Sequence, residues 1–150
     1  MRTHIGYEVG GMSKLATEYA ITKMNVFLDN DIEYNTLVLG SIHNLPIKYD
    51  RIMDWGTPDG DNVNFMFTEI NSGAWNLIIN CCCEHIYPMS EVTLAGMYIL
   101  QSNNFDLGRY INKCENLQDH ISQLGLDHIY FADRKIFNGY EYYTVIGEKD

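Results

Sequence analysis

The feature that most constrains the fold is Leu77-Ile78-Ile79, an uninterrupted run of large apolar residues between Asn76 and Asn80. Successive side chains of a strand point to opposite faces, so such a run predicts a strand that is buried on both faces. A strand of this kind needs a covering layer on each side of its sheet. The segment therefore predicts an inner strand of a layered α/β domain.

Other segments supply the remaining elements. Helical spacing of apolar residues predicts a first helix at about 12–28, and a second apolar stripe predicts a helix at about 116–124 with Gly125 as its C-terminal cap. Four short segments with apolar or alternating residues predict strands at 35–41, 51–53, 63–69 and 94–100. The polar residues 101–104 are expected to stop the last of these strands.

The end of the chain predicts a hairpin. Residues 128–137 and 141–147 flank Asn138-Gly139, a strong signal for a tight turn between antiparallel strands. The tyrosines at 140, 142 and 143 are expected to pack this hairpin or an oligomer contact. The sequence thus predicts one domain over residues 1–150, with a sheet core at about 35–147 that is mostly parallel and closes with a C-terminal antiparallel hairpin.

Charge and composition exclude several classes of function. Twenty acidic and ten basic residues give a net charge of −10, which disfavours nonspecific binding to nucleic acids. No apolar run is long enough to span a membrane, so no membrane contact is expected. Four cysteines, three of them consecutive, make a poor disulfide framework, so a cytoplasmic setting is expected. Cys81, Cys82 and Cys83 lack the spacing of a zinc site, and no metal is predicted. Buried thiols are the expected role for these cysteines, ahead of a nucleophile.

Two stretches carry a resemblance to a known family. Trp75 to Ile86 (WNLIINCCCEHI) is similar to a fourth strand and the motif that follows it, and Leu100 to Asn104 (LQSNN) is similar to the end of a fifth strand. Together with the order of elements, they resemble class I S-adenosylmethionine-dependent methyltransferases, particularly the small divergent methyltransferase-like proteins of phages. The resemblance implies a reduced Rossmann-like sheet and, for a phage protein, the host cytoplasm.

The resemblance also implies a cofactor site for S-adenosylmethionine at the carboxyl ends of the first strands. Gly40 and Ser41 match the glycine turn after the first strand, and Asp54 matches the acidic residue that accepts hydrogen bonds from ribose hydroxyls. Glu69 is similar to the acidic residue near the adenine amino group. Trp55 could place its ring against the purine or in the core.

Three residues are candidates for catalysis. Asn80, Glu84 and His85 lie where the post-strand motif of the family meets the transferred methyl group. His85 or Glu84 could remove a proton from the acceptor, since both are competent bases near neutral pH. The alternative is that Glu84 and His85 only cap a turn after a buried strand.

The leading functional hypothesis is methyl transfer from S-adenosylmethionine to a small or nucleotide-like acceptor. Few residues separate Gly40 from the strand at 51–53, and Pro46 lies among them, so the first crossover is shorter than in the family. This departure favours an alternative, a catalytically inactive protein that binds an adenosine-type ligand or a protein partner. A weaker alternative is an enzyme that cleaves S-adenosylmethionine.

Overall fold

The computed structural model describes residues 10–39, 49–53, 67–81, 83, 88–104, 114–137 and 139–150. A long helix precedes a series of strands that is interrupted by short helical segments. The elements in chain order are α2 (Gly10–Phe27), β1 (Thr36–Leu39), β2 (Arg51–Met53), β3 (Leu77–Asn80), the 3₁₀ helix η2 (Met89–Glu91), β4 (Gly96–Asn103), α4 (Leu117–Ser122), β5 (His128–Phe137) and β6 (Tyr140–Lys149).

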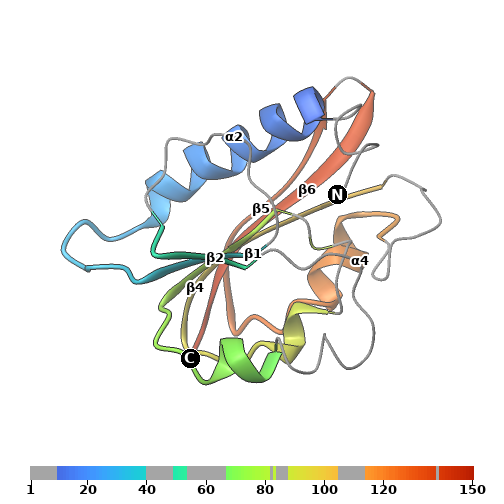
Figure 1. Cartoon of the computed structure of the whole chain (residues 1–150). Helices are drawn as coiled ribbons and strands as arrows, with labels where there is room; N and C mark the ends of the chain where they lie inside the picture. Colours follow the sequence, from blue (N-terminus) through green and yellow to red (C-terminus); the bar gives the residue numbers. More distant parts are fainter. Residues whose placement is uncertain are drawn as a thin grey trace.

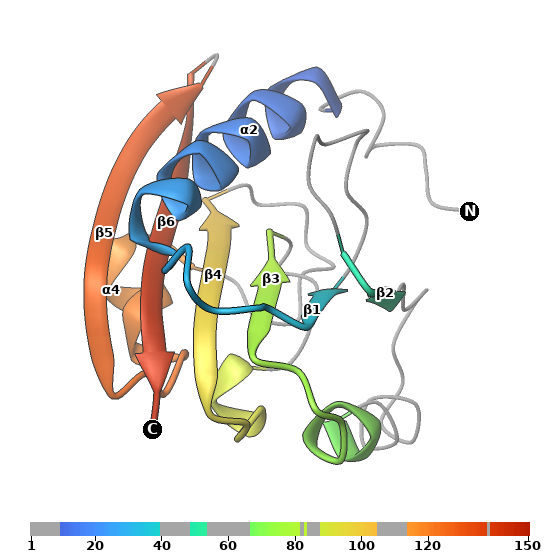
Figure 2. The same ribbon diagram turned by 90° about the vertical axis from the view of Figure 1, so that its left-hand side faces the viewer.

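The described strands form one six-stranded mixed sheet in the order β2-β1-β3-β4-β6-β5. The four strands from β2 to β4 are parallel, and β6 pairs antiparallel with both β4 and β5. Figure 2 shows this order, with α2 crossing in front of the sheet. The predictions of an α/β fold, of a strand at 51–53 and of a terminal antiparallel hairpin are confirmed.

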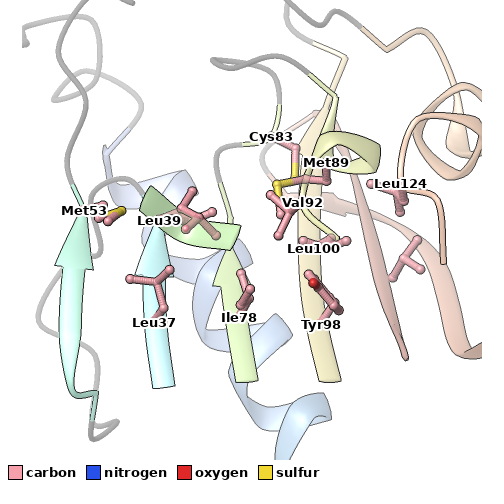
Figure 3. Packing of buried hydrophobic residues seen from close by; sticks show 12 residues of the cluster. Leu37, Leu39, Met53, Ile78, Cys83, Met89, Val92, Tyr98, Leu100 and Leu124 are labelled. Carbon is pink, nitrogen blue, oxygen red and sulfur yellow. The ribbon is translucent and has the colours of Figure 1, made fainter. Parts of the chain in front are cut away.

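Alternation along the strands builds a core on each face of the sheet. Ile78 and Leu100 face a cluster with Met89 and Leu124, whereas their neighbours Ile79 and Ile99 face the cluster that includes apolar residues of α2. Figure 3 shows the first cluster, and Figure 1 shows α2 and α4 on opposite sides of the sheet. The run at 77–79 is therefore buried on both faces, as predicted.

The predicted strand at 63–69 is wrong in its described part. Residues 67–71 are helical, because Phe67 and Ile70 lie three residues apart and both contact the core, while Thr68 is exposed. This helical segment, green in Figure 2, lies at the end of the sheet where β3 and β4 begin. The part of the prediction at 63–66 lies outside the described residues.

The strand predicted at 94–100 is shifted toward the C-terminus. β4 begins at Gly96 and continues through Gln101, Ser102 and Asn103, all of them buried. Polar residues do not stop the strand, because β6 pairs with it along its whole length and Gln101 Nε2 donates to the Ala16 carbonyl of α2 at 2.8 Å. A buried polar group is tolerated where its hydrogen bonds are made.

Candidate functional site

The strand order contains a topological switch point between β1 and β3. From β1 the chain continues to β2 on one side, and it later returns to β3 on the other side of β1. Leu39 lies beside Met53 of β2 and beside Asn80 of β3, so three carboxyl ends meet at one edge of the sheet. In open α/β sheets, ligands bind outside the carboxyl ends at such a point.

Most of the predicted site residues follow these carboxyl ends directly in the chain. They lie outside the described residues and are Gly40, Ser41, Asp54, Trp55, Glu84 and His85. Gly40 comes immediately after β1, and Asp54 immediately after β2. Their chain neighbours Leu39 and Met53 are partners in the parallel register.

Asn80 is the predicted catalytic residue that the structure describes. It ends β3, and its side chain is fully buried and directed toward the face of the sheet that carries Met89. Its side-chain nitrogen Nδ2 donates to Met89 Sδ at 3.3 Å, and its backbone carbonyl accepts from the Cys83 thiol at 3.3 Å. Asn80 thus ties the end of β3 to the segment that follows it.

Glu69 lies away from Asn80. Its carboxylate forms an ion pair with Arg51, with 2.5 Å between Oε1 and Nη2. Arg51 is the first residue of β2, and the helical segment of Glu69 lies where the parallel strands begin. The structure does not bring Glu69 together with the carboxyl ends, because a helical turn stands where the third strand was predicted.

A buried lysine holds the chain after β3 in place, and sequence reasoning missed it. Lys149 is 6% exposed, and its Nζ donates to the carbonyls of Met89 at 2.8 Å and Val92 at 2.5 Å. The ammonium lies 4.9 Å from the centre of the Tyr98 ring, a favourable position for a cation. Burial lowers the pKa of Lys149 to about 8, and the carboxylate of Asp127 opposes this effect.

A buried histidine lies under the carboxyl half of β4, and it was also missed. The Nε2 of His120 lies 3.1 Å from the Leu100 carbonyl, so this nitrogen carries the proton, while the buried Nδ1 has no hydrogen-bond partner among the residues that the structure describes. Burial lowers the pKa of His120 to about 4, and the bond to Leu100 opposes the shift. His120 belongs to the stripe of Leu117, Ile121 and Leu124, and this spacing was a signal of its burial.

The cysteines follow the expected packing where they are described. Cys83 is buried in the core cluster of Met89 and Leu100, and Cys81 packs partly buried against the opposite cluster. Cys82 lies outside the described residues. In the described part of the chain, no group of three or more His, Cys, Asp or Glu side chains is placed to hold a metal ion.

Comparisons with known proteins give no information about this site. No protein-family model matches the chain, and searches of curated proteins and of solved structures give no significant match. Among the helices that the structure describes, none is long and apolar enough to cross a membrane. Function therefore has to be inferred from the switch point and the residues next to it.

Proposed function

We propose that this protein is an S-adenosylmethionine-dependent methyltransferase that acts on a small or nucleotide-like acceptor. One observation carries the proposal, namely the switch point between β1 and β3 in a sheet whose last two strands form an antiparallel hairpin beside β4. This arrangement agrees with the reduced Rossmann-like sheet that the sequence resemblance implies. It also supports a ligand at the carboxyl ends of β1, β2 and β3.

The residues at the three carboxyl ends suit a nucleoside ligand. In this proposal Gly40 and Ser41 let the backbone approach the cofactor, and Asp54 accepts hydrogen bonds from two ribose hydroxyls. Trp55 offers a ring to the purine. Glu69 has no part in the proposal, because it is paired with Arg51 at the other end of β2.

The bound cofactor would supply the electrophilic methyl group, and the chain after β3 would supply the groups that act on the acceptor. Glu84 and His85 are the proposed bases. Asn80 is a positioning residue, because its buried amide contacts Met89 and so fixes the start of this segment. Lys149 holds the C-terminal end of the same segment, because its ammonium donates to the carbonyls of Met89 and Val92.

A specific observation also favours a second candidate, a ligand-binding protein without turnover. The eleven residues 40–50 connect β1 to β2, which is at the lower limit of about ten to twelve residues for a crossover that includes a full helix. The amide of Asn80 is directed into the core instead of toward a reacting group. A protein of this kind would bind an adenosine-type ligand at the same edge of the sheet.

Calorimetric titration tests the proposed binding site. Wild-type protein is titrated with S-adenosylmethionine and S-adenosylhomocysteine, and Asp54→Ala is compared with Asp31→Ala, a matched change in an exposed turn before β1. We expect saturable binding by the wild type. Asp54→Ala should weaken this binding at least about tenfold, because it removes hydrogen bonds to a charged group. Asp31→Ala should bind as the wild type does.

Two outcomes contradict the binding site, and a further assay separates the two candidates. Folded wild-type protein that binds neither nucleoside, or an Asp54→Ala variant with wild-type affinity, would show that the proposed site is wrong. If binding is found, methyl-labelled cofactor is incubated with nucleotide acceptors. Label that reaches an acceptor, and is lost in Glu84→Gln and His85→Asn, supports transfer; binding without transfer supports the second candidate.

A further inference from the structure

A depression of about 300 Å³ lies far from the carboxyl ends, at the end of the sheet where β3 and β4 begin. Asn76 directly precedes β3, and Gly96 and Met97 begin β4. The chain that leaves α2 forms the opposite wall, and Figure 2 shows it crossing in front of β6 and β4 on its way to β1. The other lining residues are Phe27, Asp29, Ile32, Tyr34, Tyr130 and Glu148.

A β-bulge directs an aromatic ring to the rim of this depression. Ile129 is paired with Gly147 and Phe131 with Ile146, so Tyr130 is the extra residue on β5 at the bulge. The bulge allows Tyr130 and Phe131 to reach the same face: the Tyr130 hydroxyl donates to Glu148, and the Phe131 ring lies 5.9 Å from that of Phe27. Tyr130 nevertheless remains 48% exposed.

Two carboxylates stand among these apolar walls. Glu148 faces Met97 in the antiparallel register, and Asp29 lies in the turn after α2. The Asp29 backbone nitrogen donates to the Tyr34 hydroxyl at 3.0 Å, which fixes the tyrosine beside the carboxylate. Among the described residues that line the depression, none is a lysine or an arginine. The surface is thus acidic and aromatic at once.

The neighbouring basic side chains are engaged elsewhere. The ammonium of Lys23 lies over the rings of Tyr19 and Phe131, at 5.5 Å and 5.7 Å from their centres. His128 stacks on Tyr130 and contacts the carboxylate of Asp150 at 3.0 Å. Neither Lys23 nor His128 lines the depression, so neither is placed to neutralise the carboxylates of Asp29 and Glu148.

We propose that this depression binds a small organic cation, an ammonium or guanidinium group carried on a short aliphatic chain. Carboxylates attract the charged end, aromatic faces stabilise cations at close range, and Met97 and Ile32 offer apolar contact to the chain. The volume is at the lower limit for ligand pockets, which suits a ligand of this size. The site is separate from the carboxyl-end site and goes beyond the proposed methyl transfer.

The probe is n-butylammonium, with 1-butanol as its neutral match, titrated into the full chain while backbone amide resonances are followed. We expect saturable binding of the cation with a dissociation constant on the order of 1 mM, with shifts concentrated near Met97, Tyr130 and Glu148. 1-Butanol should bind at least about fivefold more weakly. High salt should weaken binding of the cation but not of the alcohol.

Matched variants separate a built site from the general attraction of an acidic protein. Glu148→Gln and Asp29→Asn should each weaken cation binding at least about fivefold, because each removes a nearby charge. Glu91→Gln makes the same change in net charge at an exposed position of η2 and should leave binding unchanged. A double change of Tyr130 and Phe27 to Leu tests the rings while retaining both carboxylates.

The proposal is overturned by equal affinity for the cation and the alcohol, by equal weakening in Glu148→Gln and Glu91→Gln, or by shifts spread evenly over the surface. Each variant is first shown to be folded by its amide spectrum. Glu148→Gln is also titrated with S-adenosylmethionine. Unchanged nucleoside binding in that variant keeps a failure of this site distinct from a failure of the proposed function.

Discussion

Replacing Lys149 with Met should change how stability depends on pH. In the folded protein, burial lowers the pKa of Lys149 from 10.5 to about 8, and the ammonium is held against the carbonyls of Met89 and Val92. Between these two values the unfolded chain binds more protons than the folded chain. The free energy of unfolding should therefore rise with pH in this window, and the cost of burying the charge is present in full below about pH 8.

The size of the effect follows from the same two pKa values. The complete difference corresponds to about 3 kcal/mol, since one pKa unit is equivalent to about 1.4 kcal/mol. By pH 9.5 the rise due to Lys149 should reach about 2 kcal/mol. Lys149→Met cannot titrate and should lack this contribution.

Urea unfolding at pH 7, 8, 9 and 9.5 measures the effect, with tryptophan fluorescence and circular dichroism as independent probes. The informative quantity is the stability of the wild type minus that of Lys149→Met, because ionisation of the cysteines and other groups is common to both proteins. This difference should grow by about 2 kcal/mol between pH 7 and 9.5. A difference that stays within about 0.5 kcal/mol over this range would refute the assigned environment of Lys149.

Further stability predictions concern His120 and two glycines. The pKa of His120 is lowered to about 4 in the folded state, so wild-type stability should fall by about 2 kcal/mol more than that of His120→Gln between pH 7 and pH 5, and parallel pH profiles would contradict this. Gly147→Ala should destabilise by about 3 kcal/mol, because the new methyl group would lie 2.3 Å from the His128 carbonyl oxygen. Gly139→Ala should cost only about 1 kcal/mol, because a methyl group there meets no atom of the described residues within 4 Å apart from its chain neighbours, and the cost comes from its positive φ of 86°. Equal thermal shifts in the two alanine variants would be inconsistent with the packing at Gly147.

The sequence predicted those elements whose pattern is local. The apolar run at 77–79 and the turn at 138–139 identified β3 and the β5–β6 hairpin, because each signal lies within a few residues. The strand predicted at 63–69 is wrong in its described part, from residue 67, because apparent alternation concealed the spacing of Phe67 and Ile70, which bury one side of a helical turn. Short segments of this kind satisfy both periods until tertiary contacts select one.

The site was less accessible to sequence reasoning, because its supports come from distant parts of the chain. Lys149 donates a hydrogen bond to the Met89 carbonyl, and Gln101 donates one to the Ala16 carbonyl. Because both acceptors are backbone groups, the residue types in the sequence do not predict these contacts. Asn80 was correctly placed at the end of a strand, yet its burial against Met89 depends on how the following segment folds back. His120 was the exception, since its position in an apolar helical stripe was visible in the sequence.

The outer position of β5 has a consequence for association between molecules. No described strand pairs with its outer edge, and Ile129 and Ile136 are exposed on it, so β5 could template a strand from another copy. The charged residues 133–135 occupy the middle of this edge, and the bulge at Tyr130 bends one end away from a straight path. Both features impede pairing between the outer edge of this ten-residue strand and a strand of another copy.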